Sequence, residues 1–356
     1  MITQFFGGIL NLPVWLQIIL FIAFIVGGMY ALIKGADGFV SGASGIAKKL
    51  KVPAIIIGLT IVSIGTSLPE ASVSISSAIG GSADISIGNV VGSNIFNLLI
   101  VLGLSLVFVP IALNKKLVLK DFVLMLVSGI LLLIFALFGT ENATLGRIEC
   151  GILLAIFIAY IVYSIIEAKK ANKQSKELSE QDDNKQETVK LTELKEKTEQ
   201  DSTKLSKNIL LLIAGLIGII VGGDFVVFGA QNFALQIGMS EALVGLTIVA
   251  IGTSLPELVT SIVAARKGEN EIALGNVIGS NIFNILFILG MSGLIIPLTV
   301  SASVMIDIVI MTVIFALFLI FSLIKKNLPK WLGYIMIGMY IVYLLYIILR
   351  EFNIIG

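Results

Sequence analysis

The sequence predicts an all-α integral membrane protein with about ten transmembrane helices, arranged as two five-helix repeats of inverted topology. Three observations lead to this prediction. The chain is 57% hydrophobic and only 13% charged, whereas soluble domains average roughly 25% charged residues. One long motif occurs twice at a fixed separation, and basic residues gather in alternate short connections.

About ten stretches are long and apolar enough to cross the hydrocarbon core, which takes roughly 20 residues per helix. None of them has the alternating pattern of a membrane-barrel strand, so each is expected to satisfy its backbone groups as a helix. The predicted spans are residues 14–34, 53–79, 86–109, 118–138, 146–167, 208–236, 241–265, 271–296, 303–324 and 330–349.

The repeated motif has two parts. Gly-Thr-Ser-Leu-Pro-Glu at residues 65–70 returns at residues 252–257. Gly-Asn-Val-Val-Gly-Ser-Asn-Ile-Phe-Asn at residues 88–97 returns, with one Val replaced by Ile, at residues 275–284. Every matched pair is 187 residues apart without a gap, so the repeated unit is half of the chain.

The basic residues of the short connections fall on one predicted side of the membrane, together with the charged segment 168–207. The positive-inside rule puts that side in the cytoplasm and both chain termini outside the cell. Because each half has five helices, the second half enters the membrane upside down relative to the first. The residues concerned are Lys48, Lys49, Lys51, Lys115, Lys116, Lys120, Arg266, Lys267, Lys325, Lys326 and Lys330.

These observations divide the chain into a first five-helix repeat (1–167), a charged linker (168–207) and a second five-helix repeat (208–356). The linker is too polar to bury a core and is expected to be flexible or partly helical. A regulatory segment is the functional alternative for it.

The Gly-Thr-Ser-Leu-Pro-Glu motif predicts a broken helix in each half. Proline cannot donate to the carbonyl four residues back, so Pro69 and Pro256 should free backbone oxygens around Gly65 and Gly252. Broken helices within a membrane line cavities, and in transporters they bind substrate and coupling ions. The alternative is a kinked helix without a ligand, which two copies that both carry a glutamate disfavour.

The repeated polar residues form an oxygen-only set of candidate ligands. Residues four apart share a helix face, so Glu70 with Thr66, and Ser93 with Asn97, can point to one place. Ca²⁺ and Na⁺ prefer oxygen ligands, whereas softer metals need His or Cys. The chain has no histidine and one cysteine, Cys150. The equivalent residues of the second half are Glu257, Thr253, Ser280 and Asn284.

Two glutamates balance one Ca²⁺, and two or three Na⁺ could replace it in the same cavity. A site that can be filled in either way meets the physical requirement for ion exchange. The alternative for the serines and asparagines is hydrogen bonding between helices, which is common in membrane bundles.

Other repeated residues are assigned supporting roles. The small residues Gly88, Gly92, Gly275 and Gly279 are expected to let the second and third helices of each half pack closely. Ser67, Ser254, Pro69 and Pro256 support the helix breaks. Asp37 and Asp224 also repeat but are left outside the site, and Asp307 has no mate and is expected near a membrane face.

At these residues the sequence resembles the sodium/calcium exchangers of the cation/calcium antiporter superfamily, in the prokaryotic form with two alpha repeats. The resemblance implies that Glu70 and Glu257, with backbone oxygens of Thr66 and Thr253, bind Ca²⁺. It also implies alternating access, with the first and sixth helices sliding across a core that holds the site. The Na⁺ ligands that it implies are Ser93, Ser280, Asn97, Asn284 and carbonyls near Ser63 and Ala250.

One position departs from this resemblance. Many relatives have an aspartate where this chain has Asn284, so the site contains two carboxylates instead of three. The stoichiometry, the electrogenicity and any involvement of K⁺ therefore stay open.

The functional hypothesis is a Na⁺/Ca²⁺ antiporter that exports Ca²⁺, acting as a monomer in the cell (inner) membrane. No enzymatic activity, no cofactor and no nucleic-acid partner are expected. The expected partners are the two ions and the lipid bilayer. An H⁺-coupled Ca²⁺/cation antiporter is the alternative, although proton-coupled relatives usually have glutamate where this chain has Gly92 and Gly279. A passive cation channel is a third possibility, but inverted halves with broken helices fit alternating access better.

Overall fold

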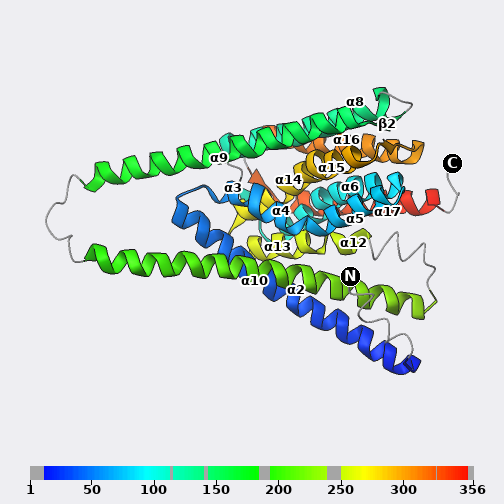
Figure 1. Cartoon of the computed structure of the whole chain (residues 1–356), viewed down its shortest axis with the longest axis horizontal. Coiled ribbons are helices and arrows are strands. Elements are labelled where there is room, and N and C mark those ends of the chain that lie inside the picture. Colours follow the sequence, from blue (N-terminus) through cyan, green and yellow to red (C-terminus); the bar gives the residue numbers. More distant parts are fainter. Residues whose placement is uncertain are drawn as a thin grey trace.

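The computed structural model describes residues 12–112, 115–139, 143–183, 193–238, 250–325 and 327–351. In this part of the chain nearly all of the backbone is helical, and the helices form one elongated bundle (Figure 1). The class predicted from the sequence, an all-α membrane protein, is therefore confirmed.

The first repeat begins with one long helix, followed by two segmented helices and two continuous ones. Its elements are α2 (Val14–Leu50); α3 (Ala54–Ile57), the π-helical η2 (Gly58–Val62), α4 (Ser63–Thr66) and α5 (Leu68–Ile79); α6 (Ala83–Phe96), the π-helical η3 (Asn97–Leu102) and α7 (Gly103–Phe108); α8 (Lys115–Phe138); and α9 (Arg147–Asp183).

In the part that the structure describes, which excludes residues 239–249, the second repeat has the same order of elements. Its elements are α10 (Glu193–Gln236); α12 (Ala250–Thr253) and α13 (Leu255–Arg266); α14 (Asn270–Phe283), the π-helical η5 (Asn284–Leu289) and α15 (Gly290–Ile295); α16 (Ala302–Ile324); and α17 (Lys330–Glu351).

Eight of the described helices are long and apolar enough to cross a membrane, and the bent pair formed by residues 54–66 and 68–79 makes a ninth. The predicted span 241–265 lies partly outside the described residues, so the count of ten stays a prediction. α2 is longer than expected, with 37 residues that continue to Leu50. The sequence estimate stopped at Lys34 because the hydrophobic run ends there. The helix continues because Phe39, Val40 and Ala43 keep one face buried.

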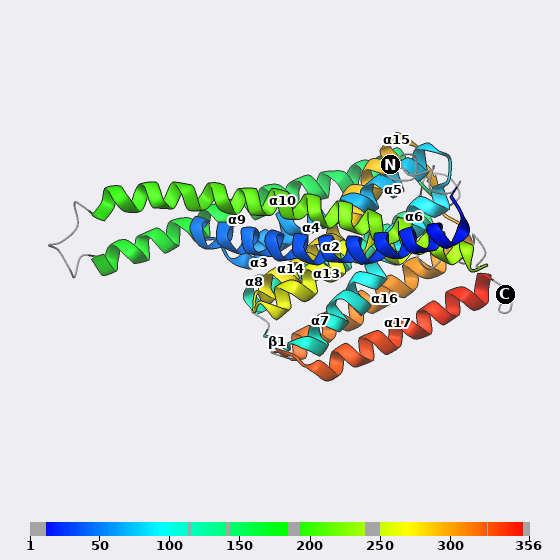
Figure 2. The ribbon, with the colours of Figure 1, turned by 90° about the horizontal axis from the view of Figure 1, so that it is seen from below.

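The charged linker extends two of the helices. α9 continues to Asp183 and α10 begins at Glu193, so the backbone of residues 168–183 and 193–207 is helical. Both helices project beyond the rest of the bundle at the same end (Figures 1 and 2). Both charged segments thus prolong helices that belong to the apolar part of the chain.

α2 and α10 pack with their backbones in contact along a seam of glycines spaced seven residues apart (Figure 2). A methyl group at Gly35 would lie 2.7 Å from the amide nitrogen of Ile219, and one at Gly222 would lie 2.7 Å from the carbonyl oxygen of Gly28. No larger side chain fits there. The seam consists of Gly28, Gly35 and Gly42 on α2 and Gly215, Gly222 and Gly229 on α10.

Two short antiparallel ribbons connect the repeats and show their inversion. β1 (Ile111–Ala112) pairs with β4 (Asn327–Leu328), and β2 (Thr144–Leu145) pairs with β3 (Leu298–Thr299). β1 and β3 occupy equivalent places in the two repeats, yet they belong to different ribbons at opposite ends of the bundle (Figures 1 and 2). The second repeat is therefore upside down relative to the first, as the sequence predicts.

The third helix of each repeat lies at the centre of the bundle. In the most apolar 18-residue window of the span from α14 to α15, 94% of the window is buried, and in that of the span from α6 to α7, 78%. The corresponding share in each of the other six continuous spans is below one half. Their apolar residues, among them Val90, Ile95, Val277 and Ile282, form one large core cluster. This core holds the polar half of the repeated motif.

Candidate ion-binding site

Each copy of Gly-Thr-Ser-Leu-Pro-Glu interrupts a helix at its serine. α4 ends at Thr66 and α5 begins at Leu68, with a bend of 50° between the two helical segments. α12 ends at Thr253 and α13 begins at Leu255 in the same way. The glutamate of each motif therefore lies in the first turn after a break.

The prolines lie beside the break and not within a continuous helix. Pro69 and Pro256 occupy the first turns of α5 and α13, where a missing N–H costs little. Ser67 N donates to the Ser63 carbonyl oxygen at 3.1 Å, and the Ser67 carbonyl oxygen accepts from Ala71 N at 3.1 Å. Pro69 has no N–H to donate to the Gly65 carbonyl oxygen four residues back. The expected break is present, at Ser67.

The two carboxylates are fully buried and each accepts a hydrogen bond from the opposite repeat. Ser254 Oγ donates to Glu70 Oε1 at 2.9 Å, and Ser67 Oγ donates to Glu257 Oε1 at 2.7 Å. The crossed pattern brings both breaks and both glutamates into one site. The sequence analysis gave Ser67 and Ser254 only a supporting role, whereas here they touch the carboxylates.

The serines of the third helices complete each half of this network. Ser93 Oγ lies 3.1 Å from Ser254 Oγ, and Ser280 Oγ lies 2.9 Å from Ser67 Oγ. Ser280 Oγ also lies 3.5 Å from the carbonyl oxygen of Ser63. The network thus includes hydroxyl, carboxylate and carbonyl oxygens from both repeats.

Several buried polar atoms of the site have no hydrogen-bond partner within the described part of the chain. They include Glu70 Oε2, Glu257 Oε2, Asn284 Oδ1 and both amide atoms of Asn97. A buried polar group without a partner costs about 1–3 kcal/mol, and more if it is charged. The oxygens among these atoms are of the type that hard cations bind. They therefore fit Ca²⁺ or Na⁺ as substrates.

Asn97 and Asn284 each begin a π-helical segment, η3 and η5. Such segments are frequent at functional sites because they alter the facing of side chains within a helix. Ala250 and Thr253 are the first and last residues of α12, where they are equivalent to Ser63 and Thr66 in α4.

A second pair of repeated asparagines meets between the repeats, which the sequence analysis did not predict. Asn94 Nδ2 lies 3.4 Å from the carbonyl oxygen of Asn281, and Asn284 Nδ2 donates to Asn94 Oδ1 at 3.1 Å. The amides of Asn94 and Asn281 also approach the sulfurs of Met311 and Met125 at 3.6 Å. The sequence signal that could have pointed to this pair is the separation of Asn94 and Asn281 by 187 residues.

A third pair of asparagines supports the backbone behind the glutamates, and the sequence analysis gave it no role either. Asn89 Nδ2 donates to Ser74 Oγ at 2.9 Å, and Asn276 Nδ2 donates to Ser261 Oγ at 2.9 Å. Each bond joins the second and third helices of its own repeat.

The glycines of the third helix have a different neighbour from the one expected. Methyl groups at Gly275 and Gly279 would lie 2.7 Å from Ile55 O and 2.6 Å from Leu59 O, on the second helix of the other repeat. The prediction that these glycines face the second helix of their own half was wrong. Methyl groups at Gly88 and Gly92 would meet no atom of the described residues within 4 Å.

Asp37 lies outside the site, in a polar contact between α2 and the connection from α13 to α14. Asp37 Oδ1 lies 2.6 Å from Lys267 Nζ. Farther along α2, Ser44 Oγ donates to Glu269 Oε1 at 2.5 Å, and Lys48 Nζ donates to the same oxygen at 3.1 Å. These contacts fasten one end of α2 to the second repeat.

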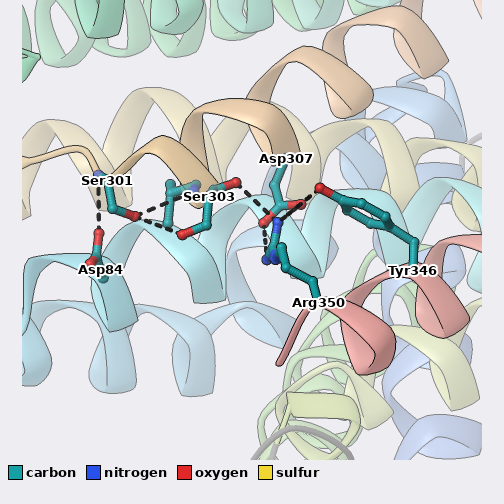
Figure 3. Close-up of polar contacts among 7 residues, drawn as sticks. Asp84, Ser301, Ser303, Asp307, Tyr346 and Arg350 are labelled. Atoms are coloured by element: carbon teal, nitrogen blue, oxygen red, sulfur yellow. Dashed lines mark hydrogen bonds and ion pairs between the residues drawn. The ribbon is translucent and has the colours of Figure 1, made fainter. Parts of the chain in front are cut away.

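Asp307, near the start of α16, forms an ion pair with Arg350 on α17 (Figure 3). Arg350 Nη2 donates to Asp307 Oδ2 at 2.9 Å and Nη1 donates to Oδ1 at 3.1 Å. Tyr346 OH accepts from the same guanidinium at 3.4 Å. At the start of α16, Asp84 Oδ1 accepts from the backbone N–H of Ser301 at 3.3 Å. The helices α6, α16 and α17 are thus linked outside the site.

Two broken helices from inverted repeats, which meet at buried carboxylates and hydroxyls within the membrane, define a secondary transporter for hard cations. The family model described as sodium/calcium exchanger protein matches residues 20–166 and 207–349. The chain therefore belongs to the sodium/calcium exchanger family and is a cation/Ca²⁺ antiporter, an integral membrane protein of a family of transporters.

Individual relatives agree with this assignment. The sodium/calcium exchanger MaX1 of Methanosarcina acetivorans is 35% identical over 342 residues, which cover 89% of this chain and 95% of MaX1. The inner membrane protein YrbG of Escherichia coli is 34% identical over 275 residues, which cover 77% of this chain and 80% of YrbG. A solved structure of the sodium-calcium exchanger NCX_Mj, soaked with 10 mM Na⁺ and zero Ca²⁺, matches with a TM-score of 0.76 and 30% identity. That match covers 91% of this chain and 98% of NCX_Mj.

Proposed function

We propose that the protein exchanges Na⁺ for Ca²⁺ by alternating access and exports Ca²⁺ from the cell. The observation that supports this most is the crossed pair of contacts, Ser254 with Glu70 and Ser67 with Glu257. Each carboxylate is held through one oxygen while its other oxygen has no hydrogen-bond partner in the described residues. One divalent cation would neutralise the two carboxylates and draw ligands from both repeats.

In this proposal Ca²⁺ is bound by Glu70 and Glu257 together with the carbonyl oxygens of Thr66 and Thr253. Na⁺ uses Ser93, Ser280, Asn97, Asn284 and the carbonyls of Ser63 and Ala250. The two ions compete because both balance the charge of the same two carboxylates, so that filling the cavity with Na⁺ releases Ca²⁺.

Na⁺ is favoured over H⁺ as the coupling ion by two observations. Gly92 and Gly279 occupy the positions at which proton-coupled relatives usually have glutamate. MaX1, which is named as a sodium/calcium exchanger, is similar over nearly its whole length.

We also propose that the protein functions as a monomer in the cell (inner) membrane, with residues 168–207 in the cytoplasm and both termini outside. The lysines of the alternate connections support this orientation through the positive-inside rule. The membrane named for YrbG supports the location.

The test is ⁴⁵Ca²⁺ uptake into liposomes that contain the purified protein and Na⁺, after dilution into Na⁺-free medium. The expected result is uptake that depends on the outward Na⁺ gradient and is lost in Glu70→Gln. Asp84→Asn serves as a matched control, because it neutralises an exposed carboxylate at the start of α6 that lies outside the site.

Two other outcomes would overturn the proposal. Uptake driven by a pH gradient alone would show proton coupling. Flux that needs no gradient of either ion, and that Glu70→Gln does not alter, would show a passive pathway.

A further inference from the structure

The side chain of Asn276 contacts the two helix breaks of the site at once. Its Nδ2 lies 3.4 Å from the carbonyl oxygen of Glu257 and donates to Ser261 Oγ at 2.9 Å, both on α13. Its Oδ1 accepts a hydrogen bond from Thr66 Oγ1 at 3.0 Å, on α4 of the other repeat. Asn276 and Thr66 are both fully buried.

The orientation of this amide follows from its partners. Nδ2 carries two hydrogens and faces two acceptors on α13, so Oδ1 is the atom left to face Thr66. The planar amide group therefore sets the separation between the end of α4 and the start of α13.

The chain itself cannot set this separation. Thr66 and Glu257 are separated by almost 200 residues of sequence, and the helices that carry them end or begin at the breaks. Any ion that binds oxygens of both repeats depends on how far apart these two segments are held.

We propose that Asn276 is a positioning residue for Ca²⁺, which acts by holding the Thr66 segment at a fixed distance from Glu257. This inference rests on the proposed function, because it takes Thr66 and Glu257 as parts of one Ca²⁺ site. Ca²⁺ binds through six to eight oxygens and gains more from each than a monovalent ion does. Loss of the fixed distance should therefore weaken Ca²⁺ binding more than Na⁺ binding.

The equivalent asparagine of the first repeat supplies a matched control. Asn89 Nδ2 makes the same two contacts within its own repeat, to Ser74 Oγ at 2.9 Å and the Glu70 carbonyl oxygen at 3.4 Å. Among the described residues, Asn89 makes no hydrogen bond to the second repeat. A variant at this position removes the hydrogen bonds within the first repeat and leaves the contact between Asn276 and Thr66 in place.

The experiment measures equilibrium ⁴⁵Ca²⁺ binding to the purified, detergent-solubilised full-length protein, with Na⁺ competition as the second readout. Thr66→Val removes the hydroxyl but keeps the backbone carbonyl, and Thr66→Ser restores the hydroxyl. We expect Asn276→Ala and Thr66→Val each to weaken Ca²⁺ binding about tenfold, the equivalent of ~1.4 kcal/mol. Thr66→Ser should bind close to wild type, and Asn89→Ala should lose less than Asn276→Ala.

Two further comparisons separate positioning from a general loss of structure. The double variant should bind no more weakly than the poorer single variant, because both changes remove the same contact. The Na⁺ concentration that displaces half of the Ca²⁺, corrected for the change in Ca²⁺ affinity, should shift less than the Ca²⁺ affinity itself.

The inference would be overturned by wild-type Ca²⁺ binding in Thr66→Val, by additive losses in the double variant, or by an equal loss in Asn89→Ala. Ca²⁺ binding is measured without any ion gradient, so the result does not depend on which ion drives transport. A failure of Na⁺ coupling would leave this test intact, and wild-type protein that binds no Ca²⁺ would overturn both proposals.

Discussion

Replacement of Gly279 by alanine adds a methyl group where the third helix of the second repeat meets the second helix of the first. The new Cβ would lie 2.5 Å from Ser63 Oγ, 2.6 Å from Leu59 O and 2.8 Å from Leu59 Cα. Ordinary contact begins at 3.4 Å, so α14 has to move by about 0.8 Å from the Leu59 backbone. Overpacking of this kind costs about 1–3 kcal/mol, of which the helix propensity of alanine recovers up to ~1 kcal/mol.

Gly338→Ala, on α17, is the matched control. Gly338 is exposed and its new Cβ meets no atom of the described residues within 4 Å, so the gain in helix propensity should dominate. Size-exclusion profiles of the detergent-solubilised protein after a series of heating steps measure the difference in stability. We expect Gly279→Ala to lose its folded peak at a lower temperature than wild type, and Gly338→Ala to match or exceed wild type. Equal behaviour of the two variants would refute the assignment of the close contact to Gly279.

Three further predictions concern side chains outside the site. Asp307→Asn should destabilise the protein by about 1–3 kcal/mol, because it weakens a two-oxygen contact with the Arg350 guanidinium; the heating series measures this, and an unchanged profile would contradict it. A double-mutant cycle of Asp37→Asn with Lys267→Gln should give a coupling energy of at most about 1 kcal/mol, because both side chains are partly exposed. Cys150 is fully buried, so a maleimide should label the folded protein slowly and the SDS-unfolded protein rapidly; equal rates would show that the thiol is accessible.

The sequence was sufficient to predict the architecture. The length of the apolar stretches, the 187-residue repeat and the distribution of the basic residues between the two sides can all be read along the chain without knowledge of its contacts. It also pointed to the two motifs that the structure brings together, and the assignment of their residues as ion ligands stays a prediction. The crossed contacts of Ser67 and Ser254 could not be predicted, because they depend on how the two repeats meet in space.

Two details of position could not be predicted, for the same reason. The motif predicts a broken helix but does not show that Pro69 lies in the first turn after the break, because a proline is compatible with either place. Gly275 was expected to contact the second helix of its own repeat. The spacing of the glycines shows that one face of the helix carries small residues, but it does not show which helix packs against that face. Asn276 was left without a role for this reason too, since its cross-repeat partner Thr66 is 210 residues away.

The two repeats carry the same candidate ligands but differ in how their first helices are fastened. At the offset of 187 residues, Lys267 and Glu269 correspond to Gly80 and Ser82, which carry no charge. Ion pairs in contact with water weaken as ionic strength rises, since the Debye length is only about 8 Å at 0.15 M, whereas the glycine seam between α2 and α10 does not respond to salt. Dissolved salt therefore loosens the fastened end of α2 and has no equivalent charge to act on at positions 80 and 82. The candidate ion site thus lies between two repeats whose first helices differ in their response to ionic strength.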